Sequence, residues 1–198
     1  MKSSLSLALL PLFLLTQCAT DIGTSAQQTT SKPIYDTKLD TSGSFRKNGY
    51  WVGDGMSGKA RIRINLTEQV AFFYKGSQLA GISPISSGQA GYDTPTGTFR
   101  ISQKNRKHNS SLYGVIVNRS TGALVNGDAD SRIDKPSAGE KYVGAPMNYF
   151  MRFNNAVGMH EGRLPGYPAS HGCVRLPTHM VKKFFQHAPI GTPVIVDY

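Results

Sequence analysis

Cysteine is scarce in this chain, with only two among 198 residues, Cys18 and Cys173. If Cys18 is modified or removed with an export segment, Cys173 has no partner for an internal disulfide. Its thiol is then either a reactive group or a small buried side chain. The surroundings of Cys173 also lack the second ligand pair of a finger-type zinc site, so we predict no metal site.

Acidic side chains are few, 12 against 22 lysines and arginines, which gives a formal net charge of +10. Such an excess favours anionic partners: nucleic acid, a membrane surface or an acidic envelope polymer. No run of Lys and Arg reaches the density of a nucleic-acid patch, and the nearest, residues 103–109 (QKNRKHN), is typical of an exposed loop. We therefore expect no nucleic-acid partner, and a solvated basic surface is the simplest interpretation of charge alone.

The chain has no apolar run long enough to span a bilayer comfortably. Its longest, residues 5–15 (LSLALLPLFLL), follows Lys2 and has the length of a signal peptide. Leu15 precedes Cys18 by three residues, which resembles a lipoprotein signal with Cys18 as the lipidated residue, although Gln17 stands where a small residue is usual. We expect an exported protein of the periplasm or cell envelope, anchored in the membrane by lipid. Plain export with cleavage nearby and a buried N-terminal helix are the alternatives.

Three segments follow from this composition. Residues 1–18 are the signal peptide with its lipidation site, and residues 19–57 form a flexible tether rich in Ser, Thr and Gln. An aromatic spot at 48–55 (NGYWVGDG) either packs on the domain or stays loose. Residues 58–198 form the folded domain.

The domain is predicted to be mainly β, of the sandwich or barrel class. Alternating residues 60–66 indicate a half-buried strand, and residues 69–88 indicate a hairpin that turns at Lys75–Ser77. Helical spacing of apolar residues appears over 176–188, where Thr178 is the expected cap. Further strands are predicted at residues 97–102, 112–118, 149–153 and 192–198.

Cys173 is the strongest candidate for covalent chemistry, because cysteine is the most nucleophilic ordinary side chain once its thiol loses a proton. That step needs a base or a positive environment. His171 stands two residues before Cys173, and His160 lies across a loop punctuated by glycines and prolines that can fold back onto the cysteine. One of these histidines can take the thiol proton and return it to a leaving amine.

Two neighbours extend the candidate site. Gly172 would let backbone N–H groups approach an oxyanion, and Arg175 would hold a carboxylate with its guanidinium fork. Each of these residues taken singly is more often structural or exposed, and only together do they favour a Cys–His acyl-transfer site. The remaining histidines are expected to be structural or exposed: His108, His179 and His187.

The motif SHGCVRL, with MHEG upstream, resembles the signature of the L,D-transpeptidase catalytic domain, the YkuD-like family. Other stretches of residues 59–198 resemble the family in the same order. They are SPISSGQAGYDTPTGTFRI (83–101), APMNYFMRF (145–153) and GTPVIV (191–196). The resemblance implies a β-sandwich-like fold and a thiol acyl-transfer mechanism on peptidoglycan, without metal or organic cofactor.

The resemblance also assigns roles by position. Cys173 matches the nucleophile and His160 the general base, while His171 would orient or stabilise. The residues matched to the oxyanion site, the motif or the substrate cleft are Gly172, Ser170, Arg175, Tyr149 and Arg152. Three departures from the family pattern concern the loop: Glu161 follows His160 where glycine is commoner, the loop to Cys173 is short, and Thr178 and His179 stand near an acidic or amide position.

The implied donor is a peptidoglycan stem tetrapeptide that loses its terminal D-alanine. A second stem amine as acceptor gives a 3→3 cross-link, and a lipoprotein lysine gives protein attachment. Water as acceptor would make the protein an L,D-carboxypeptidase or amide hydrolase. A catalytically silent wall-binding module is the alternative outside the enzyme class.

Overall fold

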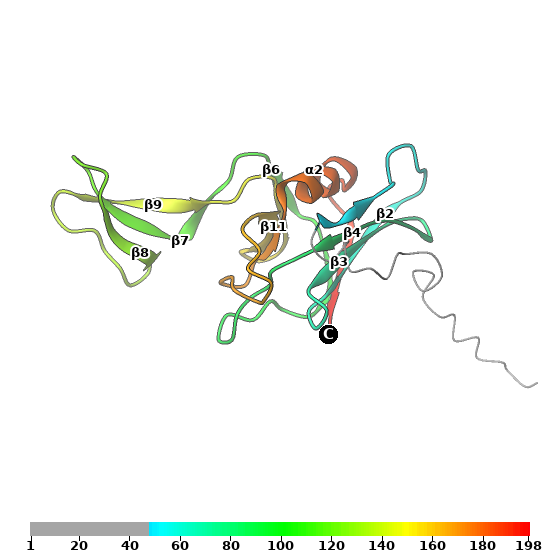
Figure 1. Cartoon of the computed structure of the whole chain (residues 1–198), viewed down its shortest axis with the longest axis horizontal. Helices are drawn as coiled ribbons and strands as arrows, with labels where there is room; N and C mark the ends of the chain where they lie inside the picture. The colour runs from blue at the N-terminus through cyan, green and yellow to red at the C-terminus, as the bar shows by residue number, and fades with distance from the viewer. Residues whose placement is uncertain (1–47) are drawn as a thin grey trace, which may run out of the picture. The chain divides into compact units, whose positions relative to one another are not determined.

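The computed structural model describes residues 48–198, so Cys18, the signal segment and most of the tether lie outside the described residues. Figure 1 shows these residues as a mainly β structure with the short helix α2. Among residues 48–198, no helix is long and apolar enough to cross a membrane.

The largest sheet has six strands in the order β1-β4-β3-β2-β13-β5. Its strands are β1 (Tyr50–Trp51), β2 (Ala60–Asn65), β3 (Val70–Lys75), β4 (Gln78–Pro84), β5 (Gly97–Arg100) and β13 (Pro193–Asp197). The predicted hairpin is confirmed, because β3 and β4 pair antiparallel around a turn in which Gly76 has φ of 60°. The alternation predicted in β2 is confirmed too, since Ile62 and Ile64 are fully buried.

A second sheet has four strands in the order β12-β11-β10-β6. Its strands are β6 (Gln103–Asn105), β10 (Phe150–Asn154), β11 (Val157–Glu161) and β12 (Val174–Leu176). One continuous buried cluster joins both sheets to α2 (Thr178–His187). It includes Ile62 and Phe73 from the first sheet, Met159 and Val174 from the second, and Phe184 from the helix. This layered arrangement confirms the predicted mainly β, sandwich-like class.

Helix α2 follows the cysteine segment as predicted, but its N-terminus differs from expectation. Pro177 occupies the cap position, and no side chain caps the first turn. The Thr178 hydroxyl instead donates to Glu161 Oε1. The prediction of Thr178 as a cap is therefore wrong, because a tertiary acceptor competes for its hydroxyl.

Strand β1 lies within residues 19–57, the segment predicted to be a tether. Trp51 packs against Phe73 and Phe184, with ring centroids 5.2 and 6.1 Å away. Asp54 accepts from Trp51 Nε1 and also bonds Lys183 of α2. The aromatic spot thus packs on the domain rather than staying loose, since one large aromatic side chain buries enough apolar surface to fix an otherwise polar segment.

The third sheet contains β7 (Asn109–Asn118), β8 (Leu124–Asp130) and β9 (Glu140–Pro146), in the order β8-β7-β9. None of its residues belongs to the buried cluster shared by the other two sheets. Its side chains are mostly exposed or half-buried, with Ile116 and Ala129 among the exceptions. Figure 1 shows these three strands as a separate sheet.

Candidate active site

The pairing of β11 with β12 places the predicted nucleophile and base on one face. These strands are parallel, with Met159 opposite Val174 and His160 opposite Arg175. Met159 and Val174 are fully buried in the core, so alternation turns His160 and Arg175 toward the other face. Cys173 lies two residues before Arg175, directly before β12. Cys173, His160 and Arg175 all line one cavity of about 460 Å³.

The turn that presents Cys173 is held by side-chain hydrogen bonds. Ser170 is 2% exposed; its Oγ accepts from the Gly172 N–H at 3.1 Å and donates to the Cys173 carbonyl. The Thr94 hydroxyl donates to the Gly172 carbonyl at 2.8 Å. Buried groups with this many partners hold a single backbone conformation. Ser170 and Thr94 therefore fix the turn itself.

Gly172 is required for its backbone geometry rather than for space. Its φ is 104°, a left-handed value that other residues rarely adopt. A Cβ at this position would meet no non-neighbouring atom closer than 3.6 Å. The Gly172 N–H is already donated to Ser170 Oγ, so the glycine serves to shape the turn before Cys173.

His160 is arranged to accept a proton through one ring nitrogen. The ring is 6% exposed, and its Nδ1 lies 2.6 Å from the Glu161 carbonyl oxygen. Because a carbonyl can only accept, Nδ1 carries the proton of the neutral ring and Nε2 has a free lone pair. Burial lowers the pKa of His160 to about 4, so the imidazole is neutral at physiological pH.

The Cys173 thiol is protonated at rest. Burial among neighbouring atoms raises its pKa, which outweighs the opposing influence of a Gly158 backbone hydrogen bond and of Arg152 and Arg175. A neutral thiol therefore shares the cavity with a neutral imidazole. The proton must leave the sulfur during the reaction, which makes a base such as His160 necessary.

Two of the three arginines that line the cavity, Arg152 and Arg175, differ in their internal contacts. Arg152 Nε donates to Gln103 and its Nη1 to the Asn155 carbonyl, so internal contacts fix it. Arg175 is half-buried and forms no ion pair with any residue between 48 and 198. A half-buried, unpaired guanidinium facing a cavity is suited to bind a carboxylate.

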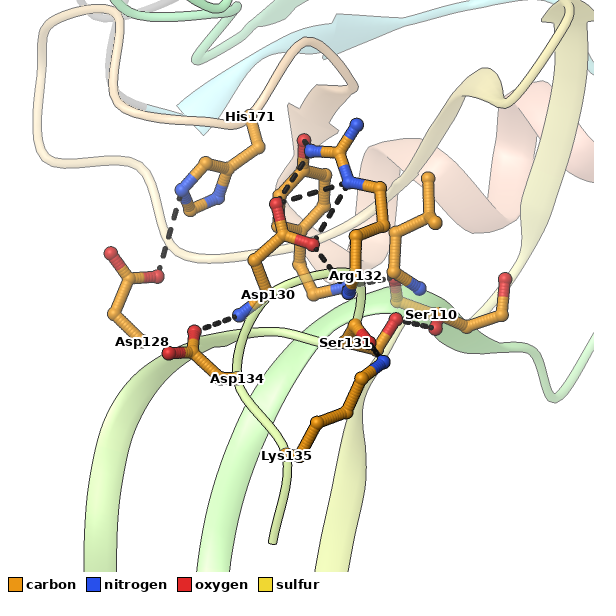
Figure 2. A network of polar contacts seen from close by, with 11 residues as sticks. Ser110, Asp128, Asp130, Ser131, Arg132, Asp134, Lys135 and His171 are labelled. Atoms are coloured by element: carbon orange, nitrogen blue, oxygen red, sulfur yellow. Dashed lines mark hydrogen bonds and ion pairs between the residues drawn. The ribbon is translucent and has the colours of Figure 1, made fainter.

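His171 connects the cysteine turn to the three-stranded sheet. Its ring stacks on Tyr113 of β7, with centroids 4.3 Å apart, and meets the Tyr92 ring edge-on at 4.5 Å. Figure 2 shows His171 turned toward Asp128, whose Oδ1 lies 3.6 Å from Nε2. His171 lines the cavity, and its ring is held between the rings of Tyr113 and Tyr92.

A polar network stiffens the part of the sheet that His171 meets. Figure 2 shows Arg132 bonded to both Asp130 oxygens, and its Nη2 also lies 3.0 Å from the Tyr113 hydroxyl. These bonds lower the pKa of Asp130 to about 2, so its carboxylate stays charged. The Asp134 carboxylate accepts the Asp130 N–H at 2.7 Å. Tyr113, the His171 partner, is thereby anchored within its own sheet.

Comparisons with known proteins agree with this geometry. A family model described as the L,D-transpeptidase catalytic domain matches residues 59–196. This chain belongs to the L,D-transpeptidase family. Enzymes of this family catalyse the cross-linking of peptidoglycan. The resemblance noted in the sequence is confirmed.

Two curated relatives are both described as probable L,D-transpeptidases. ErfK/SrfK of Salmonella typhimurium is 27% identical over 138 residues, covering 69% of this chain and 44% of the relative. YbiS of Escherichia coli K12 is 28% identical over 134 residues, covering 67% and 43%. The chain thus spans less than half the length of these relatives.

Solved structures of the L,D-transpeptidase family share the fold. An enzyme from Mycobacterium smegmatis aligns with a TM-score of 0.52 at 18% identity, covering 71% of this chain and 59% of that one. One from Xylanimonas cellulosilytica aligns with a TM-score of 0.51 at 22% identity, covering 74% and 64%. At such identities the likeness establishes the architecture.

Glu161, one departure from the L,D-transpeptidase pattern, has a structural role here. Its carboxylate accepts from Asn148 Nδ2 at 3.0 Å and from the Thr178 hydroxyl. These bonds lower the pKa of Glu161, with the Thr178 bond the largest cause. The side chain of Glu161 thus connects β11 to the start of α2, while its carbonyl orients His160.

Two placements in this L,D-transpeptidase site differ from the sequence expectations. His108, expected to be structural or exposed, lines the cavity and stacks on Phe150 at 4.4 Å. Tyr149, expected in the substrate cleft, does not line that cavity, because its φ of 56° turns it toward a separate groove beside α2. Arg152, three residues on, does line the cavity. No periodicity in the sequence indicated the positive φ of Tyr149 or the position of His108 in the cavity.

Proposed function

We propose that this chain is a cysteine-dependent acyltransferase acting on peptidoglycan stem peptides. The observation that supports it is the sharing of one cavity by Cys173 and by a neutral His160 whose Nδ1 is held by the Glu161 carbonyl. Because the Nδ1–H is donated to the Glu161 carbonyl, Nε2 is the ring nitrogen that can accept a proton. Membership of the L,D-transpeptidase family indicates peptidoglycan as the polymer on which Cys173 and His160 act.

The reaction begins with loss of the thiol proton. His160 Nε2 takes the Cys173 proton as the sulfur attacks the carbonyl carbon of the L-centre of the third residue in a stem tetrapeptide. We assign stabilisation of the resulting oxyanion to the N–H of Cys173, because Gly172 already donates to Ser170. The C–N bond then breaks, D-alanine leaves with the proton from His160, and a thioester remains on Cys173.

An amine resolves the thioester. Its nitrogen attacks the acyl carbon and gives a proton to His160, and the returning proton restores the Cys173 thiol. A side-chain amine of a second stem yields a 3→3 cross-link, and a lipoprotein lysine yields an attached protein. We propose that Arg175 holds a stem carboxylate, because its guanidinium faces the cavity without an ion pair in the described part of the chain.

The proposal is tested with a purified disaccharide tetrapeptide as substrate and mass analysis of the products. Cross-linked dimers indicate transfer, tripeptides indicate hydrolysis, and unchanged substrate supports the silent wall-binding module. Cys173→Ala should remove all product, a loss of at least about 10³-fold, while circular dichroism stays unchanged. A variant that still turns over would contradict the mechanism, as would a wild-type protein that a carbapenem fails to acylate.

We also propose that the chain is exported and lipidated at Cys18, which lies outside the described residues. The signal-like segment 5–15 and the spacing of Leu15 from Cys18 support this. Palmitate labelling of the wild-type protein, with Cys18→Ser as the control, tests it. Equal labelling of both would contradict lipidation at this cysteine.

A further inference from the structure

A second groove, of about 380 Å³, lies where β6, the start of β10 and α2 meet. Its lining combines three cations, two aromatic rings and one amide, and contains no carboxylate: Lys104, Arg106, Lys182, Tyr149, Phe185 and Gln186. None of these residues lines the catalytic cavity. Positive charge beside aromatic surface is the combination that binds anionic ligands with apolar faces.

Tyr149 is held in this groove at a backbone cost. Its φ of 56° is unusual for a bulky side chain, and such conformations cost about 1–3 kcal/mol. The Tyr149 ring packs edge-on against Phe185 at 5.6 Å, and Lys182 Nζ lies 5.7 Å from the ring centroid. The half-buried Tyr149 side chain packs against the edge of the core cluster and also lines the groove, so part of its aromatic surface faces the groove.

The three cations are not equivalent. Lys104 Nζ donates to the Phe185 carbonyl at 2.5 Å and so satisfies the C-terminal end of α2, which explains it structurally. Arg106 and Lys182 are exposed, and neither forms an ion pair with a residue in the range 48–198. These two side chains are available to a ligand.

We propose that this groove binds the carboxylate-bearing glycan–peptide polymer of the cell wall outside the catalytic cavity. Arg106 and Lys182 pair with polymer carboxylates, and the Tyr149 ring packs against a sugar or peptide face. The inference rests on the proposed function for the identity of the polymer.

The chain links this groove to the catalytic cavity. Tyr149 immediately precedes β10, and Arg152 of the same strand lines the cavity. A polymer held in the groove is therefore presented beside the catalytic site.

The test is co-sedimentation of the full chain with purified, insoluble peptidoglycan sacculi, with every protein carrying Cys173→Ala to prevent turnover. Arg106→Glu with Lys182→Glu should weaken binding by about tenfold or more. The matched control is Lys59→Glu with Arg119→Glu, which changes the net charge equally at exposed sites away from the groove. Equal losses in both double variants would overturn the proposal, because net charge alone would then explain binding.

Two further arms separate carboxylates and the ring from charge in general. The first arm uses sacculi whose carboxylates are amidated. They should bind the Cys173→Ala protein as weakly as native sacculi bind the Arg106→Glu, Lys182→Glu groove variant. Unchanged binding to amidated sacculi would overturn the carboxylate assignment. Tyr149→Asn keeps a residue that tolerates positive φ and removes the ring, so sacculus binding should fall several-fold with little change in melting temperature. Full binding by that variant would overturn the role of the ring.

Turnover of the soluble disaccharide tetrapeptide by proteins with Cys173 intact distinguishes this inference from the proposed function. The turnover rate of the groove variant on that small substrate should lie within about twofold of the wild-type rate, since the small substrate touches only the catalytic cavity. Failure of the wild type on this substrate contradicts the proposed function. Failure of the sedimentation test with normal turnover contradicts the groove alone.

Discussion

The two sides of the catalytic cavity are built differently. His160 stands on β11 and Cys173 directly precedes β12, and the opposite faces of both strands are buried in the main core. Tyr113 and Asp128 stand on the three-stranded sheet, which contributes nothing to that core and meets His171 through a ring stack and a polar contact with the exposed Asp128. Elements with few buried contacts open at lower free energy than core strands. Cys173 and His160, the proposed reacting groups, are therefore on the rigid side, and the three-stranded side is the one able to move.

The largest expected effect comes from the rigid side. His160→Gln should lower kcat/KM by about 10²–10⁴, because the neutral thiol then has no base to take its proton. Steady-state kinetics on the soluble tetrapeptide measures this loss. Asp128→Asn, on the other side of the cavity, is the comparison variant, and an equal loss there would contradict the division between the two sides.

Ser170→Ala should destabilise the protein by roughly 2–3 kcal/mol, because the Gly172 N–H loses its acceptor and the Cys173 carbonyl loses its donor. Chemical denaturation measures the change. Ser111→Ala, at an exposed position on β7, should cost less than about 0.5 kcal/mol. A Ser170 variant as stable as the Ser111 variant would show that the turn does not depend on this hydroxyl.

Acid should weaken the rigid side through His160. Its pKa is about 4 in the folded state against an ordinary value of 6.5, so the unfolded chain binds the proton first. The stability that this pKa difference contributes is present above pH 6.5 and is lost as the pH drops toward 4. Between pH 7 and 5.5, protonation linked to His160 should lower the free energy of unfolding by about 1.2 kcal/mol. The fall should be smaller by that amount in His160→Gln, and identical pH profiles would contradict the assignment.

The smallest global effect is expected on the three-stranded side. Tyr113→Leu removes the ring stacked on His171 and should change the unfolding free energy by less than about 1 kcal/mol. Amide exchange in β7–β9 should accelerate, and KM should rise several-fold while kcat changes little. Tyr113→Phe keeps the stack and loses only the bond to Arg132, so it is the matched control. Strongly reduced global stability in Tyr113→Leu would show that both sides unfold together.

Sequence reasoning succeeded where a local pattern has a local cause. The alternation of Ile62 and Ile64 and the turn at Gly76 gave the hairpin sheet, and the apolar spacing gave α2. The motif around Cys173 named residues that the structure brings into one cavity. These features depend on side-chain periodicity and on short-range turn geometry.

The features that were not predicted depend on distant partners. Strands β8 and β9 show no regular alternation of apolar and polar residues, and neither contributes to the main core. Thr94 contacts the Gly172 carbonyl from 78 residues away, and Trp51 joins β1 to a helix near the other end of the chain. Tyr149 could not be placed because nothing in its neighbours announces a positive φ. Such positions become visible only when the whole chain is assembled.

The parallel pairing of β11 and β12 divides the catalytic segment into parts that respond differently to insertion. One extra residue within either strand would rotate His160 or Arg175 into the core and bring an apolar side chain to the surface. Extra residues between Gly162 and Ala169 would leave that register untouched. Under the proposed function, changes of length in this loop can therefore alter which acceptors reach the thioester without moving Cys173 and His160.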